Sequence, residues 1–173
     1  MKKKIAILGS TGSIGNSLLD IIESEKKKYE IILLTANKNY KKLLHQAKKF
    51  SVQNIIILNQ ESFQKACNLN KKKNIKIFNS FEKFNLIFKN KKIDYVMSSI
   101  VGLDGLYPTV KIIKYTKKIA IANKESIICA WNLIHHELKK YKTEFIPVDS
   151  EHFSIWFGLQ NFNSKNIERI YIT

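Results

Sequence analysis

Short β-rich runs alternate with longer segments of helical periodicity along most of this 173-residue chain. Runs rich in β-branched residues and bounded by turn residues predict strands, and apolar residues three and four positions apart predict amphipathic helices. The predicted strands are Lys4 to Leu8, Glu30 to Thr35, Asn54 to Leu58, Ile75 to Phe78, Asp94 to Ser98, Ile119 to Ala122 and Glu144 to Val148. The predicted helices are Ser13 to Lys28, Asn39 to Phe50, Glu61 to Asn68, Phe81 to Lys89, Leu106 to Tyr115 and Lys124 to Tyr141. This alternation predicts an α/β fold, a doubly wound and mostly parallel sheet with helices on both faces.

The pattern changes after residue 150, which divides the chain into two predicted parts. Residues 1–150 contain no repeat or flexible linker and are expected to form one domain. Residues 151–173 begin with an apolar and aromatic stretch from Phe153 to Leu159 and end in a strand signal from Glu168 to Thr173. Because a strand needs a neighbour for its backbone groups, this lone strand suggests a second domain that has been cut off.

The net charge of +16 raises the question of a nucleic-acid partner. Arg169 is the only arginine beside 29 lysines, whereas base recognition favours arginine. The lysines are also spread in short runs, so a general compositional bias explains the charge and we expect no nucleic-acid partner. Cys67 and Cys129 lie far apart without metal-site spacing, which predicts reduced thiols in the core. No apolar stretch approaches the roughly 20 residues of a membrane span, and we expect a cytoplasmic protein with no membrane partner.

A glycine-rich segment, Gly9 to Gly15 (Gly-Ser-Thr-Gly-Ser-Ile-Gly), directly follows the first predicted strand and opens the first predicted helix. In this context glycines permit a tight turn and close approach of the backbone to a pyrophosphate, which the helix N-terminus then holds. The spacing is Gly-x-x-Gly-x-x-Gly, a variant of the usual fingerprint. It predicts a dinucleotide site, with a glycine-rich turn that binds no ligand as the alternative.

The end of the second predicted strand bears on the choice of nicotinamide cofactor. Enzymes that prefer NAD carry an acidic residue there, which binds the ribose 2′-hydroxyl. This chain has Asn37, Lys38 and Asn39 instead, and a lysine with two amides suits a 2′-phosphate that a carboxylate would repel. We therefore predict NADPH rather than NADH. The alternative is that Lys38 is one more solvated lysine.

Two later segments follow predicted strands at the carboxyl edge of the sheet, where doubly wound folds bind ligands. A lysine in the first segment, Asn123 to Ser126, can hold a substrate phosphate or polarise a carbonyl. The second, Asp149-Ser150-Glu151, carries carboxylates on alternate residues, and oxygen ligands without cysteine favour Mg²⁺ or Mn²⁺ over zinc. Ordinary helix caps and first-turn residues explain the same patterns without a ligand. Two carboxylates also leave a metal shell incomplete.

Together and in this order, the three motifs closely resemble those of the 1-deoxy-D-xylulose 5-phosphate reductoisomerases, NADPH-dependent enzymes of non-mevalonate isoprenoid biosynthesis. The resemblance covers essentially the whole chain, although members of the family are more than twice as long. It implies a Rossmann-like NADPH-binding domain over residues 1–150 and the start of a truncated catalytic domain over residues 151–173. It also implies that the full-length family is homodimeric.

The resemblance assigns roles to individual residues. Lys124 would be catalytic and contact the substrate, Ser150 would bind the sugar phosphate, and Glu151 would bind both the substrate and a Mg²⁺ or Mn²⁺ ion. Asp149 would be the second metal ligand, and the family commonly has glycine where this chain has Asn37. The implied NADPH-binding residues are Thr11, Gly12, Ser13, Ile14, Asn37, Lys38, Asn39, Asn123 and Glu125.

The implied reaction is a metal-assisted rearrangement of 1-deoxy-D-xylulose 5-phosphate, a small sugar phosphate, followed by hydride transfer from NADPH to give 2-C-methyl-D-erythritol 4-phosphate. Because the metal shell is incomplete, we predict that this chain alone does not turn over. The alternative is a non-catalytic NADPH-binding module or a decayed remnant of such an enzyme. A dehydrogenase of the semialdehyde type needs a nucleophilic cysteine, and Cys129 in a predicted helix interior is poorly placed for that role.

Overall fold

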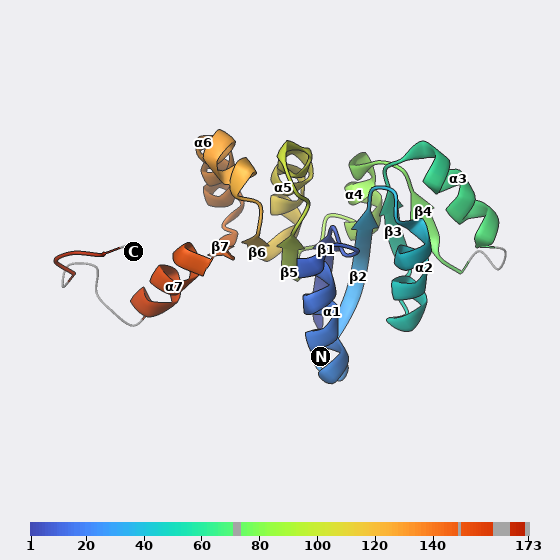
Figure 1. Ribbon diagram of the computed structural model, residues 1–173, viewed down its shortest axis with the longest axis horizontal. Coiled ribbons are helices and arrows are strands. Elements are labelled where there is room, and N and C mark those ends of the chain that lie inside the picture. Colours follow the sequence, from blue (N-terminus) through green and yellow to red (C-terminus); the bar gives the residue numbers. More distant parts are fainter. Residues whose placement is uncertain (71–73, 149, 161–166, 172–173) are drawn as a thin grey trace.

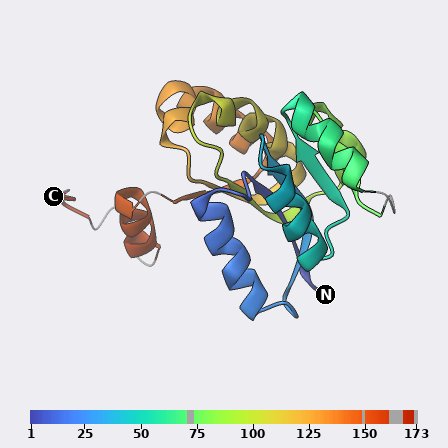
Figure 2. The ribbon, with the colours of Figure 1, turned by 45° about the vertical axis from the view of Figure 1, so that its right-hand side comes forward.

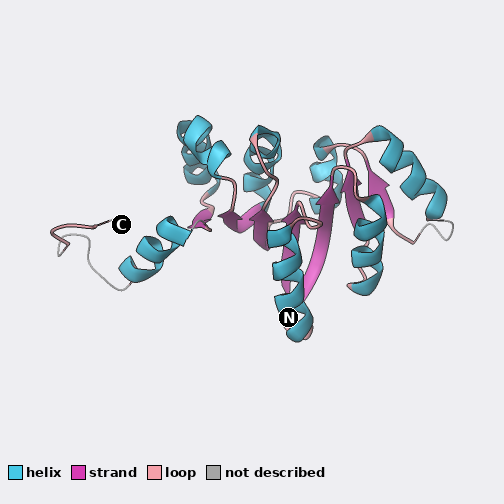
Figure 3. Cartoon of the chain, viewed as in Figure 1, coloured by secondary structure: helices cyan, strands magenta, loops and turns pink. Residues whose placement is uncertain are grey.

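The computed structural model describes residues 1–70, 74–148, 150–160 and 167–171. Within these residues, seven parallel strands form one sheet in the order β4-β3-β2-β1-β5-β6-β7 (Figures 1 and 3). The strands are β1 (Lys3–Leu8), β2 (Tyr29–Ala36), β3 (Asn54–Ile57), β4 (Lys76–Phe78), β5 (Ile93–Ser98), β6 (Thr116–Ile121) and β7 (Glu144–Pro147). Each predicted strand as far as residue 148 is present, and the ends differ by no more than three residues.

Helices connect the strands and cover both faces of the sheet (Figures 1 and 2). From β1 the chain steps outward to β4 through α1, α2 and α3, and it then crosses back to β5 and steps outward to β7 through α5 and α6. Reversing the direction of stepping places the second set of helices on the opposite face, because crossovers between parallel strands are right-handed. The helices are α1 (Ser13–Ser24), α2 (Tyr40–Lys49), α3 (Gln60–Leu69), α4 (Phe84–Phe88), α5 (Leu106–Ile112), α6 (Lys124–Tyr141) and α7 (Ser150–Leu159). The doubly wound fold class is therefore confirmed.

The central strand β1 contributes to two apolar layers. Ile5 and Ile7 pack with Leu19 and Ile22 of α1 and with the buried side of α2. Ala6 and Leu8 belong to the layer under α5 and α6 on the other face. Since successive strand residues point to opposite faces, a continuous apolar run marks a strand that is covered on both sides.

Several predicted helix ends are wrong. Helix α1 ends at Ser24 rather than Lys28, because Lys26 to Lys28 bring no apolar residue to its buried face, and the amide of Lys28 instead donates to the carbonyl of Glu25 at 2.8 Å. The predicted helix Phe81 to Lys89 is a 3₁₀ turn (Phe81–Lys83) followed by the short α4. The helix predicted to reach Tyr115 ends at Ile112 and continues as a 3₁₀ turn.

The segment after β7 differs most from the prediction. Its aromatic stretch lies in α7, which leads away from the edge of the sheet (Figures 1 and 2). The strand predicted from Glu168 is wrong for its described part, because residues 168–171 pair with no strand. The last two residues of that prediction lie outside the described residues.

The structure also bears on the two cysteines and on the question of membrane spans. Cys67 and Cys129 are exposed rather than buried in the core, because each lies on the outward side of its helix. Among the helices that the structure describes, none is both long enough and apolar enough to cross a membrane.

Candidate functional site

The candidate site lies at the point where the strand order reverses, between the carboxyl ends of β1 and β5. The amide and the hydroxyl of Ser99, just after β5, donate to the carbonyl oxygen of Leu8 at 3.0 and 2.8 Å. Loops that diverge at such a switch point leave a crevice in which α/β proteins bind ligands. The glycine loop, defined here as residues 9–15, forms one side of this position.

Two glycines of the loop are required by its geometry. Gly9 has a φ of +83°, and a Cβ there would lie 2.8 Å from the carbonyl oxygen of Ser99. A Cβ on Gly15 would lie 2.5 Å from the Cα of Ser10, so only glycine lets α1 start this close to the turn. Gly12 is different, because a Cβ there meets nothing closer than 3.4 Å. Its missing side chain keeps the outer side of the loop open.

Buried polar side chains hold the loop from beneath. Thr35 at the end of β2 accepts from the amide of Gly9 through Oγ1 at 2.9 Å and from the amide of Ser10 through its carbonyl at 3.0 Å. Gln46 of α2 donates to the carbonyl of Ser10 at 3.0 Å and accepts from the Ser10 hydroxyl at 2.8 Å. The ammonium of Lys42, one turn earlier in α2, lies 3.2 Å from the carbonyl of Thr11. The loop is therefore fixed by β2 and α2, and a positive charge lies beside it.

The predicted cofactor residues of this loop are accessible at the N-terminus of α1. Gly12, Ser13 and Ile14 are exposed, and Thr11 is half-buried. Gly12 is the N-cap of α1 and supplies no capping side chain. The first-turn amides and the positive end of the helix dipole therefore face outward, which is the arrangement that binds phosphate groups.

The segment after β2 lies next to this loop. Asn37 and Lys38 are exposed, and the carbonyl of Asn37 accepts from the amide of Asn59 at 3.2 Å. Asn39 caps α2 by accepting from the amide of Lys42 at 3.3 Å. No acidic residue stands at this strand end, so the local charge favours an anionic group.

Asn123 has an internal structural role that we did not predict. Its side chain is 1% exposed, caps α6 by accepting from the amide of Ser126 at 2.7 Å, and donates to the carbonyls of Ile100 and Gly102. A Cβ on Gly105 would lie 2.3 Å from Nδ2 of Asn123, so this close packing requires glycine. Both N–H groups of Asn123 are thus used within the protein, and its predicted contact with the cofactor stays a prediction.

Lys124 and Glu151 line the same groove between α6 and α7. The groove has a volume of about 770 Å³, and its walls are mostly apolar. Lys124 is exposed in the first turn of α6, where Glu125 beside it is half-buried. The groove residues are Lys124, Ile127, Ile128, Trp131, Phe145, Pro147, Glu151, His152, Ile155 and Trp156. A lysine and a carboxylate predicted to share a cleft are therefore brought together.

The remaining predicted metal and substrate residues are less completely placed. Asp149 lies outside the described residues, and the backbone of Ser150 begins α7. In the described part of the chain, no three His, Cys, Asp or Glu side chains gather in a way that would hold a metal ion. Among the described residues that line the groove, Glu151 is the only carboxylate.

No sequence motif singled out the α2 residues that contact the loop. Lys42 and Gln46 are four residues apart and follow the cap Asn39, so helical periodicity places them on one side of α2. Gln46 also stands between the buried residues Leu43 and Ala47. A polar residue inside an apolar stripe is the signal that would have found it, because a buried amide needs a hydrogen-bond partner.

The matching family model and the curated relatives carry the same description. Residues 5–131 match the family model described as 1-deoxy-D-xylulose 5-phosphate reductoisomerase. The protein of that name from Pelagibacter ubique is 60% identical over 172 residues, which are 99% of this chain and 44% of the relative. The one from Phocaeicola vulgatus is 39% identical over 100% of this chain and 45% of its own length. The chain thus spans less than half the length of the curated relatives it matches.

Solved structures show the same similarity. The reductoisomerase from Zymomonas mobilis in complex with NADPH superposes with a TM-score of 0.79 and 32% identity, covering 87% of this chain and 40% of the other. A reductoisomerase solved in complex with magnesium also superposes with a TM-score of 0.79 and 32% sequence identity, covering 88% of this chain and 38% of that one. A homoserine dehydrogenase from Thiobacillus denitrificans superposes with a TM-score of 0.55 and 13% sequence identity, and it shares the fold alone.

Proposed function

Because this chain belongs to the 1-deoxy-D-xylulose 5-phosphate reductoisomerase family, we propose that it is the NADPH-binding part of such an enzyme. The observation that carries the proposal is the glycine loop at the switch point of the sheet, with the N-terminus of α1 open to an anion. A relative with the same fold at a TM-score of 0.79 was solved with NADPH. The proposed cofactor contacts are those predicted from the sequence, from Thr11 to Ile14, Asn37 to Asn39, Asn123 and Glu125.

The two parts of the chain have different proposed roles. Residues 1–150 would bind NADPH, and residues 151–173 would begin the catalytic domain. In a whole enzyme the reaction is the conversion of 1-deoxy-D-xylulose 5-phosphate to 2-C-methyl-D-erythritol 4-phosphate. The proposed setting is a cytoplasmic homodimer.

The groove between α6 and α7 is the proposed position of the sugar phosphate. Lys124 would bind it through charge, since an ammonium in a mostly apolar groove interacts strongly with an anionic or polarised oxygen. Ser150 would bind the phosphate. Asp149 and Glu151 would hold Mg²⁺ or Mn²⁺, and oxygen ligands suit these hard cations. When bound, such an ion supplies Lewis acidity for the rearrangement, and NADPH supplies the hydride.

Cofactor choice is tested by calorimetric titration of the purified chain. We expect NADPH to bind at least about tenfold more tightly than NADH, because Lys38 and the neighbouring amides favour a 2′-phosphate. Replacing the exposed Lys38 by Glu should weaken NADPH binding and leave NADH binding unchanged. Lys139→Glu, an equal charge change in the last turn of α6, is the control. Equal binding of both nucleotides by the wild type would contradict the NADPH preference, and failure to bind either would contradict the proposed function.

The same preparation tests turnover. Because the described residues hold no three-ligand metal cluster, we expect no substrate-dependent oxidation of NADPH in the presence of Mg²⁺ or Mn²⁺. Binding of NADPH without turnover fits both a part of the enzyme and a non-catalytic binding module. Measurable turnover by the 173-residue chain would refute the expected inactivity and leave the family assignment intact.

A further inference from the structure

Gln46 is a buried polar residue to which the proposed function gives no role. It is 5% exposed on the side of α2 that faces the sheet. Its Nε2 donates to the carbonyl of Ser10 at 3.0 Å and to Oδ1 of Asn16 at 2.9 Å, and its Oε1 accepts from the hydroxyl of Ser10 at 2.8 Å. Every hydrogen of this amide is therefore used on the glycine loop or on the helix that follows it.

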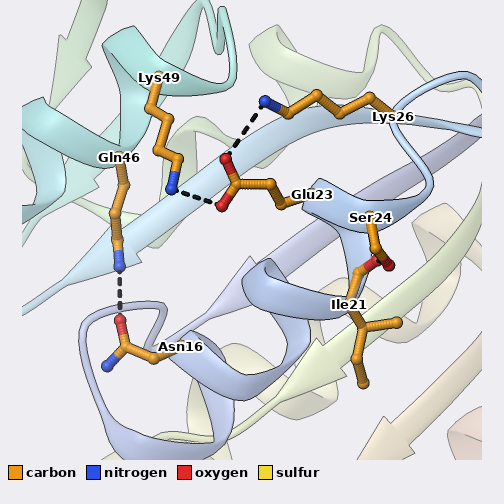
Figure 4. A network of polar contacts seen from close by, with 7 residues as sticks. All are labelled: Asn16, Ile21, Glu23, Ser24, Lys26, Gln46 and Lys49. Carbon is orange, nitrogen blue, oxygen red and sulfur yellow. Dashed lines mark hydrogen bonds and ion pairs between the residues drawn. The ribbon is translucent and has the colours of Figure 1, made fainter.

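Asn16 continues the same chain of bonds (Figure 4). Because its Oδ1 accepts from Gln46, its Nδ2 is turned toward the loop, where it donates to the carbonyls of Gly12 at 2.6 Å and Thr11 at 3.2 Å. Gln46 thus anchors the carbonyl of Ser10 directly and reinforces the carbonyl of Gly12 through the side chain of Asn16, because that carbonyl also accepts from the backbone amide of Asn16 at 3.0 Å.

Anchoring these two carbonyls fixes two amides. In a trans peptide the N–H of a residue points away from the carbonyl of the preceding residue, and the described part of the chain has only trans peptides. The carbonyl of Ser10 is held toward α2, so the N–H of Thr11 points away from α2; the carbonyl of Gly12 is held toward Asn16, so the N–H of Ser13 points away from the body of α1. Neither amide has an acceptor within the described residues. They are donors available to an anion.

A second contact between the same helices provides a control for the Gln46 bonds, because it lies away from the glycine loop. Lys49 pairs with Glu23, which also pairs with Lys26 at 3.3 Å (Figure 4). This ion pair joins α2 to α1 but lies at the far end of α1 from the loop, and its side chains are exposed by 40% and 37%. Exposed pairs of this kind contribute little to stability.

We propose that Gln46 is a positioning residue that orients the amides of Thr11 and Ser13 toward the pyrophosphate of NADPH. The proposal rests on the proposed function, because it needs NADPH to bind at the glycine loop. Amides that are oriented before the ligand arrives lose little freedom when they bind it. Removing the donors of Gln46 therefore weakens binding without removing any group that touches the nucleotide.

The test compares four forms of the full chain: wild type, Gln46→Glu, Asn16→Ala and the control Lys49→Gln. Glutamate keeps the size of Gln46 but has no hydrogen to donate to Ser10 or Asn16. We expect the Kd for NADPH to rise about tenfold or more in Gln46→Glu and Asn16→Ala and to stay unchanged in Lys49→Gln. Thermal unfolding without ligand shows that each variant is folded.

Amide resonances give a readout that a loss of general stability would not produce. In the wild type, NADPH should shift the resonances of both Thr11 and Ser13. In Asn16→Ala, the Ser13 shift should be reduced, because only the backbone bond to the carbonyl of Gly12 remains, and the Thr11 shift should be kept, because the bonds of Gln46 to Ser10 remain. In Gln46→Glu, both shifts should be reduced.

The outcomes separate the two proposals. If the wild type does not bind NADPH, the proposed function fails, and the role of Gln46 fails with it. If the wild type binds and Gln46→Glu binds equally well, only the role of Gln46 is overturned. Should Gln46→Glu not fold, Asn16→Ala decides the matter, since unchanged affinity and unchanged Ser13 shifts in that variant contradict the anchoring of the loop.

Discussion

At the scale of single residues, Asn123 joins two segments at the carboxyl edge of the sheet. Its side chain accepts from the first turn of α6 and donates to two carbonyls of the loop that follows β5. That loop includes Gly102, with a φ of +73°, and the exposed Val101. The buried amide therefore holds the start of α6, and with it Lys124, against the loop beside the switch point.

Replacing Asn123 by Ala should lower the free energy of unfolding by about 3 kcal/mol, since one cap and two further buried hydrogen bonds are lost. Asn59→Ala is the matched control, because Asn59 caps α3 through one bond, to the amide of Ser62 at 2.9 Å. We expect this control to lose about 1 kcal/mol. Urea unfolding measures both values, and equal losses would show that the two bonds to the loop contribute nothing.

Ser126 presents the opposite case, a buried hydroxyl whose removal should be harmless. It is fully buried, and its Oγ has no hydrogen-bond partner within the described residues. Ser126→Ala should therefore leave the free energy of unfolding unchanged or raise it by about 1 kcal/mol. Ser98 is equally buried, but its Oγ lies 2.6 Å from Oγ1 of Thr109, so Ser98→Ala should lose about 1 kcal/mol. A clear loss in Ser126→Ala would mean that its hydroxyl is paired in solution.

Residue roles were predictable only where a local pattern carries them. The glycine spacing marks the loop because Gly9 and Gly15 meet neighbours that the strand-turn-helix geometry brings close. Asn123 is recognisable as a helix cap from its own segment. Its bonds to residues more than twenty positions earlier depend on how β5 and β6 pair, which no local pattern encodes.

At the scale of elements, the start of α1 is set by its contact with the turn before it. Alanine in place of glycine within a helix normally adds about 0.5–1 kcal/mol of stability. Gly15→Ala should instead lose about 2 kcal/mol, because the new Cβ meets the Cα of Ser10 at 2.5 Å and the helix must move. Thermal unfolding checks the sign of the change.

Gly12→Ala is the companion variant. Its backbone, with φ −76° and ψ 176°, suits any residue, and the nearest atom to a new Cβ is 3.4 Å away. It should therefore stay folded with a small loss of stability, whereas its added methyl on the open side of the loop should abolish NADPH binding. Unimpaired binding by Gly12→Ala would place the pyrophosphate elsewhere.

Elements were predicted well where apolar periodicity continues to the end of the element. It stops at Ile22 in α1, and the lysines beyond gave no sign that the helix ends at Ser24. Helix α7 was not predicted because its own aromatic and apolar residues lie on several sides of the helix and form no single apolar stripe. Phe157 in that helix is 62% exposed, so burial does not organise the segment either.

At the scale of the molecule, Asp94 of β5 ties its two neighbouring strands, β1 and β6, to it near their amino ends. Its carboxylate accepts from the side chain of Lys117 at 2.8 Å and from the backbone amide of Lys4 at 2.8 Å. The bond from Lys117, followed by that from the Lys4 amide, lowers the pKa of Asp94 below its usual range. The stabilisation is therefore present above the pKa of the unfolded chain and is lost as the pH falls through the lower, folded value.

Asp94→Asn should consequently be less stable than the wild type near neutral pH and approach it as the pH drops below about 4. Urea unfolding from about pH 7 to pH 3 measures this difference. Asp20→Asn is the control, since Asp20 is exposed on α1 and forms no ion pair among the described residues. A difference between wild type and Asp94→Asn that is independent of pH would contradict the role of the charge.

The doubly wound class followed from the alternation of strands and helices, and its two layers of helices followed from the handedness of the crossovers. Neither gave the order of the strands. That order depends on β5 returning to pair with β1 rather than extending the sheet beyond β4. The candidate site depends on the same step, because it lies where the carboxyl ends of β1 and β5 come together and Ser99 donates to the carbonyl of Leu8.

Among the seven strands of this sheet, β1 is synthesised first, and it is the central strand of the finished sheet. Strand β2 follows closely, but the other neighbour of β1 begins only at Ile93. At about 5–20 residues per second, synthesis of the intervening chain takes on the order of ten seconds. During that interval one side of β1 and the apolar face of Ala6 and Leu8 lack their final partners. The nascent chain is therefore most open to mispairing and chaperone capture after the glycine loop has been synthesised and before β5 arrives.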